Sequence, residues 1–274
     1  MTSTTTVDGR AATYLEAGSG PGRPLLLVHG YTGSKEDFEP VLRGLGERRR
    51  VIAVDLPGHG GSPGSDDPGA YALGPTSAWV LAFADSVGLD DFHLLGHSMG
   101  GLVVQRVAAA ASQRLLSLTL MATGMGAVRD EAAEHLTRMA LAARDHGVEA
   151  AWAAGQQRPP RAIEPPTDPA RDAFVRRRFR ALSPAALVGG ARNLVGAAPL
   201  GAFLRGIDVP VLVIHGEHDD AWLPSEQAEL ARITRGARYV VVPDAVHSPQ
   251  LENAEYWLKA VTSFLDDAET SHRP

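Results

Sequence analysis

The stretch GHSMG at residues 96–100 decides how this chain is interpreted. It follows the apolar run 92–95, which predicts a buried strand, and leads into 100–111, whose small and apolar residues predict a helix. Two glycines at this spacing let a chain turn sharply from strand to helix without Cβ clashes. The turn exposes the Ser98 hydroxyl at the carboxyl end of the strand, beside the free N–H groups of the helix start. The stretch therefore predicts a reactive serine.

Short apolar runs and helical patterns alternate on both sides of this turn. Buried strands are predicted at 25–28, 51–54, 92–95, 116–121, 211–214 and 239–242, and helices at 76–87, 100–111, 225–232 and 254–265. Such alternation indicates an α/β chain with a doubly wound parallel sheet, in which functional groups gather at the carboxyl ends of the strands.

The alternation stops between about Gly124 and Arg205, where no strand pattern appears. Alanine- and arginine-rich helical segments at 131–143 and 171–182 stand there instead, joined by the proline-rich connection 158–169. We interpret this region as an insertion in the sheet domain. The predicted domains are a core at 1–123 and 206–274 and a helical cap, or lid, at 124–205.

A serine hydroxyl is a weak nucleophile and needs a base that is held in place by an acid. In strand-turn-helix sites of this kind the acid and then the histidine follow the serine along the chain. Asp219 follows the predicted strand 211–214, and His247 follows the next one. The catalytic prediction is therefore Ser98, Asp219 and His247, with Asp220 as the alternative acid if the loop is shifted by one residue.

The other histidines fit this role less well. His29, His59 and His97 lie in glycine-rich turns, where we expect structural hydrogen bonds, and His97 is expected on the opposite face from Ser98 because neighbouring strand side chains alternate. His215 and His218 match no metal-binding spacing, so no metal is predicted. The oxyanion of an ester reaction needs backbone donors, and the N–H groups of Tyr31 and Met99 are the predicted pair.

Composition narrows the class of protein. The 274 residues are 44% hydrophobic and 21% charged, as in an ordinary globular enzyme. The net charge of -6 argues against nucleic acid as a partner, and no cysteine is present for a disulfide or thiolate site. The polar start of the chain lacks a secretory pattern, and no apolar run is long enough to span a membrane, so a cytoplasmic location is expected. The oligomeric state is left open.

The predicted cap has its own charge balance and large apolar side chains. Residues 125–205 hold 12 Arg and no Lys against 8 acidic residues, and the densest cluster is 176–180. A solvated helix face explains such a cluster, and an inward-pointing arginine that pairs with a substrate carboxylate is the alternative. Trp152 of the cap and Trp222, just after the acid, are the candidates to line a pocket for a small to medium, mostly apolar substrate, and packing between cap helices or against the sheet is the alternative for each.

Taken together, these residues resemble the α/β-hydrolase superfamily. The resemblance rests on GHSMG, on His29-Gly30, on DLPGHGGS at 55–62, on the acid loop and on the late histidine. It implies the α/β-hydrolase fold, with a mostly parallel eight-stranded sheet flanked by helices and an inserted helical cap. It also implies hydrolysis of a carboxylic ester, lactone or thioester through an acyl-enzyme at Ser98, with no cofactor.

Two other activities and one non-catalytic role are the alternatives for the same residues. Carbon-carbon bond hydrolases of β-diketone-like substrates retain the serine but usually carry Asn where this chain has His97. A cofactor-free perhydrolase reaction can use the same three residues. A non-catalytic ligand-binding receptor would have no need to retain all of them.

Overall fold

The computed structural model describes residues 2–157 and 169–271. Its centre is an eight-stranded sheet in the order β1-β2-β4-β3-β5-β6-β7-β8. The strands are β1 (Thr2–Val7), β2 (Arg10–Ala17), β3 (Gly22–Val28), β4 (Arg49–Val54), β5 (Phe92–His97), β6 (Leu115–Met121), β7 (Val211–Gly216) and β8 (Arg238–Val242). The six strands from β3 to β8 are parallel, whereas β2 is antiparallel to both of its neighbours.

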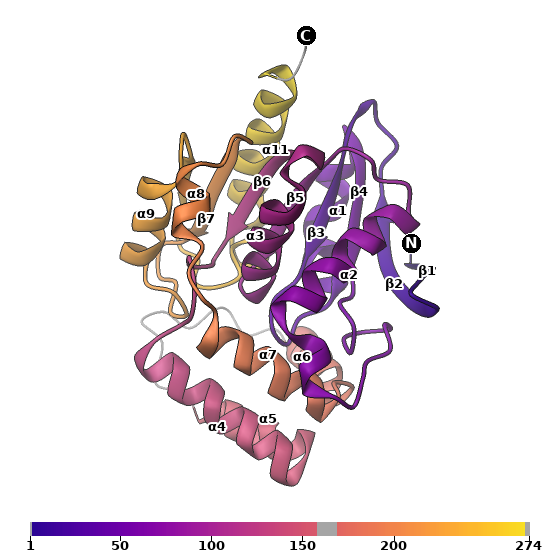
Figure 1. The fold of residues 1–274 in the computed structure, drawn as a ribbon, viewed down its shortest axis with the longest axis vertical. Helices are drawn as coiled ribbons and strands as arrows, with labels where there is room; N and C mark the ends of the chain where they lie inside the picture. The colour runs from indigo at the N-terminus through magenta and orange to yellow at the C-terminus, as the bar shows by residue number, and fades with distance from the viewer. Residues whose placement is uncertain (1, 158–168, 272–274) are drawn as a thin grey trace.

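Helices cover both faces of this sheet (Figure 1). The described residues form the helices α1 (Glu39–Gly46), α2 (Leu73–Ser86), α3 (Met99–Ala111), α4 (Asp130–His146), α5 (Val148–Gln156), α6 (Pro169–Arg180), α7 (Pro184–Gly196), α8 (Gly201–Arg205), α9 (Pro224–Ile233), α10 (Pro249–Glu252) and α11 (Ala254–Ser271). The short 3-10 turns are η1 (Lys35–Phe38), η2 (Pro68–Tyr71) and η3 (Ser112–Arg114).

Successive strand residues enter two separate apolar cores. In β3, Leu25 and Leu27 face the core that α1 and α11 close, whereas Leu26 and Val28 face the core that α2 and α3 close. This two-sided burial explains why the parallel strands are continuous apolar runs in the sequence. The second of these cores continues into α4 and α7 through residues such as Met139 and Leu187. The sheet and the helical segment between β6 and β7 are therefore packed against each other.

All six strands predicted from the apolar runs are present. The eight-stranded, mostly parallel sheet that the resemblance implied is also present, and it includes β1 and β2, which the apolar runs did not predict. Those two strands form a polar hairpin at the edge of the sheet, so they lack a buried apolar run. Asp8 and Gly9 both have positive φ at its turn, and an Asp-Gly pair is typical of a two-residue hairpin turn.

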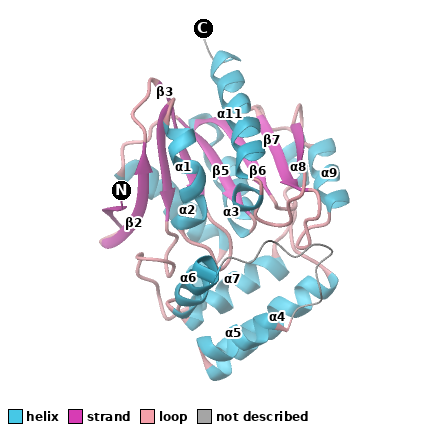
Figure 2. Ribbon diagram, turned by 180° about the vertical axis from the view of Figure 1, so that it is seen from behind, coloured by secondary structure: helices cyan, strands magenta, loops and turns pink. Residues whose placement is uncertain are grey.

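Between β6 and β7, helices α4 to α7 lie together beyond one end of the sheet in both ribbon views (Figure 2). The described residues of this stretch, 122–157 and 169–210, contain no strand. The helix expected at 171–182 is α6, which begins two residues earlier, and most of the proline-rich connection lies outside the described residues. Among the helices described here, none is both long enough and apolar enough to cross a bilayer.

Candidate active site

The turn at residues 96–100 has the strained geometry that its glycines predicted. Strand β5 ends at His97, helix α3 begins at Met99, and Ser98 between them has φ 55° and ψ -120°. A Cβ on Gly96 would lie 2.3 Å from the Gly100 carbonyl oxygen, and a Cβ on Gly100 would lie 2.5 Å from the backbone oxygens of β3 and its following residue. Because neither position has room for a side chain, strand and helix approach closely and Ser98 is held in a conformation that non-glycine residues rarely adopt.

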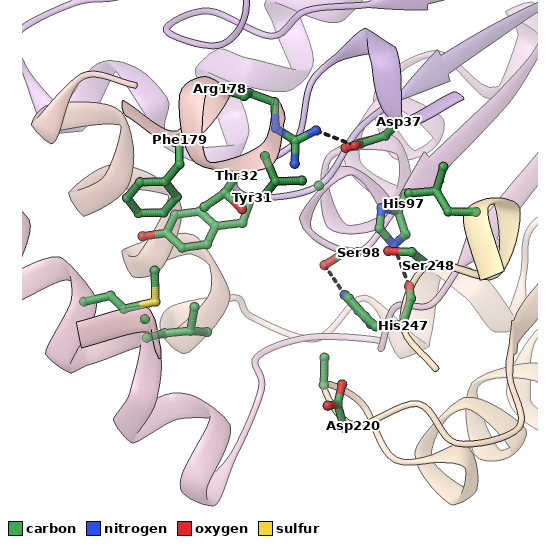
Figure 3. Close-up of a pocket in the computed structure, with 18 of the residues that line it drawn as sticks. Tyr31, Thr32, Asp37, His97, Ser98, Arg178, Phe179, Asp220, His247 and Ser248 are labelled. Atoms are coloured by element: carbon green, nitrogen blue, oxygen red, sulfur yellow. Dashed lines mark hydrogen bonds and ion pairs between the residues drawn. The ribbon is translucent and has the colours of Figure 1, made fainter. Parts of the chain in front are cut away.

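The structure brings Ser98, His247 and Asp219 into one hydrogen-bonded chain (Figure 3 shows the Ser98 end of it). The distance from His247 Nε2 to Ser98 Oγ is 3.0 Å, and His247 Nδ1 donates to Asp219 Oδ1 at 2.9 Å. Since Nδ1 carries the hydrogen, Nε2 is the acceptor for the serine proton. This arrangement can remove a proton from Ser98 and return it.

Asp219 is a buried anion with several donors. The backbone N–H of Ala221 donates to Oδ1 at 3.0 Å, and the side-chain amide of Gln227 donates to Oδ2 at 2.9 Å. Burial would raise the pKa of Asp219, but the charge of His247 and these hydrogen bonds outweigh it and hold the pKa below its usual range. The neighbouring Asp220 is exposed, so it is Asp219 that contacts the histidine.

Gln227 in α9 is a site residue that the sequence analysis did not identify. It is fully buried, and its side chain also donates to the Trp222 carbonyl and accepts from the Thr123 N–H. A signal for it existed, because Gln227 stands three residues before Leu230, on the face of the helix that packs into the core. A polar residue in an apolar stripe indicates a buried polar partner.

The loop that carries His247 is fixed by two side chains on either side of it. Glu252 accepts from the N–H groups of Val246 at 2.7 Å and Ser248 at 3.1 Å, and His97 Nε2 lies 2.8 Å from the His247 carbonyl oxygen. The expectation that His97 lies on the opposite face from Ser98 is wrong: both line the same cavity. The reason is that Ser98 no longer has strand geometry, so side-chain alternation ends at His97.

The loop at residues 29–33, beside Ser98, is also held by hydrogen bonds that orient its backbone amide groups. The Gly30 carbonyl accepts from His29 Nδ1 at 2.8 Å and from the Gly33 N–H at 3.1 Å, and His59 Nε2 lies 2.7 Å from the Tyr31 carbonyl oxygen. In a trans peptide the N–H points away from the C=O, so these bonds orient the Tyr31 N–H. Burial and the nearby His59 lower the pKa of His29 to about 3, which keeps it neutral.

Ser98 opens into a cavity of about 1080 Å³ that runs between the core and helices α4 to α7. Trp152 and Trp222 both line it: Trp152 packs edge-on against Phe179 with ring centres 5.1 Å apart, and Trp222 lies 6.5 Å from the His247 ring. Tyr31, Met139 and Phe179 contribute further apolar surface to the cavity lining. His215, by contrast, bonds to Tyr239 away from the cavity, and the described residues contain no metal-binding cluster.

The family profile described as alpha/beta hydrolase fold matches residues 23–254. The chain belongs to the α/β-hydrolase family. A solved structure, the enol-lactonase from Burkholderia xenovorans LB400, superimposes on this hydrolase with a TM-score of 0.84 at 28% identity, covering 96% of this chain and all of that one.

Two curated relatives are similar along most of this hydrolase. The first is the dihydrolipoyllysine-residue acetyltransferase component of the acetoin cleaving system of Pseudomonas putida, 32% identical over 94% of this chain and 68% of its own length. The second is the pimeloyl-[acyl-carrier protein] methyl ester esterase of Neisseria meningitidis serogroup B, 28% identical over 89% of this chain and 93% of its own. Their names point to acyl chemistry in both proteins.

Proposed function

We propose that this α/β hydrolase cleaves a carboxylic ester or lactone by way of an acyl-enzyme at Ser98. The observation that carries the proposal is the hydrogen-bonded chain from Ser98 through His247 to Asp219 at the floor of the cavity. The enol-lactonase and the methyl ester esterase among its relatives support ester bonds as the target.

Each residue has one task in the proposed reaction. Ser98 Oγ attacks the carbonyl carbon while His247 Nε2 takes its proton, and the imidazolium then gives that proton to the leaving alcohol. A water molecule repeats the sequence on the acyl-enzyme and releases the carboxylic acid and free Ser98. Asp219 keeps the hydrogen on His247 Nδ1 and stabilises the positive ring through both steps.

The negative oxygen of the tetrahedral intermediate needs donors that are already in place. We assign this task to the backbone N–H groups of Tyr31 and Met99. The Met99 amide is the first of α3, where helix geometry supplies no partner four residues back. A Cβ on Gly30 would lie 3.1 Å from Ser98 Cβ, so the Gly30-Tyr31 peptide is close enough to the nucleophile to act with it.

Helices α4 to α7 act as the cap in this proposal and select the substrate. Most of the side chains that they turn toward Ser98 are apolar, such as Met139, Trp152 and Phe179. The cavity of about 1080 Å³ is large for a single acetate ester. A small to medium, mostly apolar ester therefore fits it, and Trp152 and Trp222 are its proposed contacts.

The experiment compares Ser98→Ala with Ser248→Ala on a panel of p-nitrophenyl esters and aliphatic lactones. Ser248 also lines the cavity, but His247 Nε2 is bonded to Ser98. Ser98→Ala should lower kcat at least about a thousandfold, and Ser248→Ala should stay within about fivefold of the unsubstituted protein. Activity that survives in Ser98→Ala overturns the proposal. Adding a β-diketone to the panel tests the carbon-carbon alternative, which predicts faster cleavage of the ketone than of any ester.

A further inference from the structure

The wall that the cap contributes holds charged as well as apolar side chains, and one of its arginines is paired with a carboxylate of the core. Arg178 of α6 donates through Nη1 to Asp37 of η1, so the pair joins the cap to the core. The two side chains are only 10% and 13% exposed. Figure 3 draws the Arg178 guanidinium beside Asp37, at the edge of the same cavity as Ser98.

Arg178 has donors left over after this pairing. A guanidinium has five N–H bonds, and toward the described residues Arg178 donates only through Nη1, to Asp37 and more distantly to Ser34 Oγ at 3.5 Å. Nε is buried, and neither Nε nor Nη2 donates a hydrogen bond to any residue that the structure describes. Because Nε has almost no accessible surface, Nη2 is the donor that an acceptor in the cavity can reach, and a donor left without an acceptor costs free energy.

The charge of the site decides which acceptor fits. Asp37 already balances the positive charge of Arg178, while the partly buried Glu36 pairs with Lys35 and Glu252 accepts from the amides of the His247 loop. Around the whole cavity the described lining residues include seven carboxylates and two guanidinium groups. A substrate carboxylate beside Asp37 would add an uncompensated negative charge in an enclosed space. A neutral carbonyl accepts the same hydrogen bond without that cost.

We propose that Arg178, with its charge balanced by Asp37, binds a second, uncharged carbonyl group in the substrate, away from the scissile ester. The inference rests on the proposed function and narrows its substrate class to esters or lactones that also carry an amide, ketone or thioester carbonyl. The alternative of the sequence analysis, an inward-pointing arginine that pairs with a substrate carboxylate, did not take Asp37 into account, and the proposal names a neutral partner instead.

The test uses three matched series of p-nitrophenyl esters with acyl chains of six to nine carbons. The chains end in a methyl group, an N-methyl amide or a carboxylate, and kcat/KM is measured for each. At its best chain length the amide series should exceed the methyl series by about tenfold or more, the range expected of a hydrogen bond from a charged donor. The carboxylate series should fall below the amide series.

Two substitutions then separate substrate binding from a purely structural ion pair. Arg178→Met should bring the amide-to-methyl ratio close to one. Asp37→Asn removes the balancing charge and should raise the carboxylate series to or above the amide series. Arg180→Gln is the matched control, because Arg180 lies on the same helix and pairs with the exposed Glu149. It should leave both ratios unchanged.

The ratios make the outcomes distinct. If the pair only fastens α6 to the core, Arg178→Met lowers all three series equally and the inference is overturned. A wild-type preference for the carboxylate series, or an unchanged amide-to-methyl ratio in Arg178→Met, overturns it as well. Failure of the proposed function looks different, since no ester of any series would then be cleaved in a manner that depends on Ser98.

Discussion

The two walls of the cavity are built in different ways. The core wall holds Ser98, His247 and Asp219 in one chain of side-chain hydrogen bonds, at a turn whose glycines have no room for a side chain. The cap wall is formed by side chains of α4 to α7, packed against one another, and the Arg178–Asp37 pair ties α6 to the core. If the proposed function holds, this contrast means that the reaction depends on a tightly bonded set of core residues, whereas the choice of substrate depends on packed cap side chains that can change without disturbing that set.

The largest effect should come from the acid in the core wall. Asp219→Asn removes the charge that holds His247 in the correct tautomer, and kcat should fall by roughly a thousandfold to ten-thousandfold. Asp220→Asn is the control, since that neighbour is exposed and Asp219 is the residue bonded to His247. Steady-state kinetics at pH 8 checks both, and equal losses in the two variants would contradict the assignment of the acid.

A smaller effect is expected from the side chain that fixes the His247 loop. Glu252→Ala removes both hydrogen bonds to the amides that flank His247, so kcat should fall by about tenfold to a hundredfold while KM changes little. Glu252→Gln retains an acceptor oxygen and should recover part of the loss. Glu269→Ala is the control, because Glu269 binds Arg49 at a different place, at the end of α11. If Glu269→Ala lowers kcat as much as Glu252→Ala does, the effect is one of general stability and not of the His247 loop.

The core wall was also the part that the sequence could predict. A nucleophile turn, an acid and a histidine each follow an apolar strand, and parallel strands bring such positions to one edge of the sheet. One prediction in the core wall, that His97 faces away from Ser98, was wrong because side-chain alternation ends where Ser98 leaves strand geometry. Gln227 and Glu252 were missed because their roles depend on distant backbone groups. In the cap wall, the Arg178–Asp37 pair joins residues 141 positions apart, a distance that no local pattern encodes.

His97 gives the core wall a pH-dependent stability. Burial and the nearby His247 lower the pKa of His97 to about 4, so the folded state resists protonation while the unfolded chain takes up a proton below about pH 6.5. Stability is therefore retained above pH 6.5 and lost as the pH falls toward 4. Lowering the pH from 7 to 5 should therefore reduce the free energy of unfolding by about 2 kcal/mol through His97 alone.

Urea unfolding of His97→Gln at the two pH values measures this contribution. The glutamine amide can still donate to the His247 carbonyl, but it does not titrate. Over the same pH interval, the free energy of unfolding of the variant should fall by about 2 kcal/mol less than that of the unsubstituted protein. An identical pH dependence in both proteins would mean that His97 is not the responsible group.

The smallest effect should come from the cap wall. Trp152 is partly buried and packs on Phe179, so Trp152→Ala should raise KM for six- to nine-carbon esters by several-fold and leave kcat for p-nitrophenyl acetate within about twofold. Leu141→Ala, an exposed residue of α4, should change neither constant. A collapse of kcat for the acetate ester in Trp152→Ala would remove the distinction between the two walls.

The most direct test of an activated Ser98 is intact-mass analysis after treatment with a fluorophosphonate. The unsubstituted protein, Ser98→Ala and His247→Ala are labelled side by side, with circular dichroism to verify that each is folded. The account predicts one adduct on the unsubstituted protein, none on Ser98→Ala, and labelling of His247→Ala that is slower by at least about a hundredfold. An adduct of the same mass on Ser98→Ala, or no adduct on the folded unsubstituted protein, would contradict it.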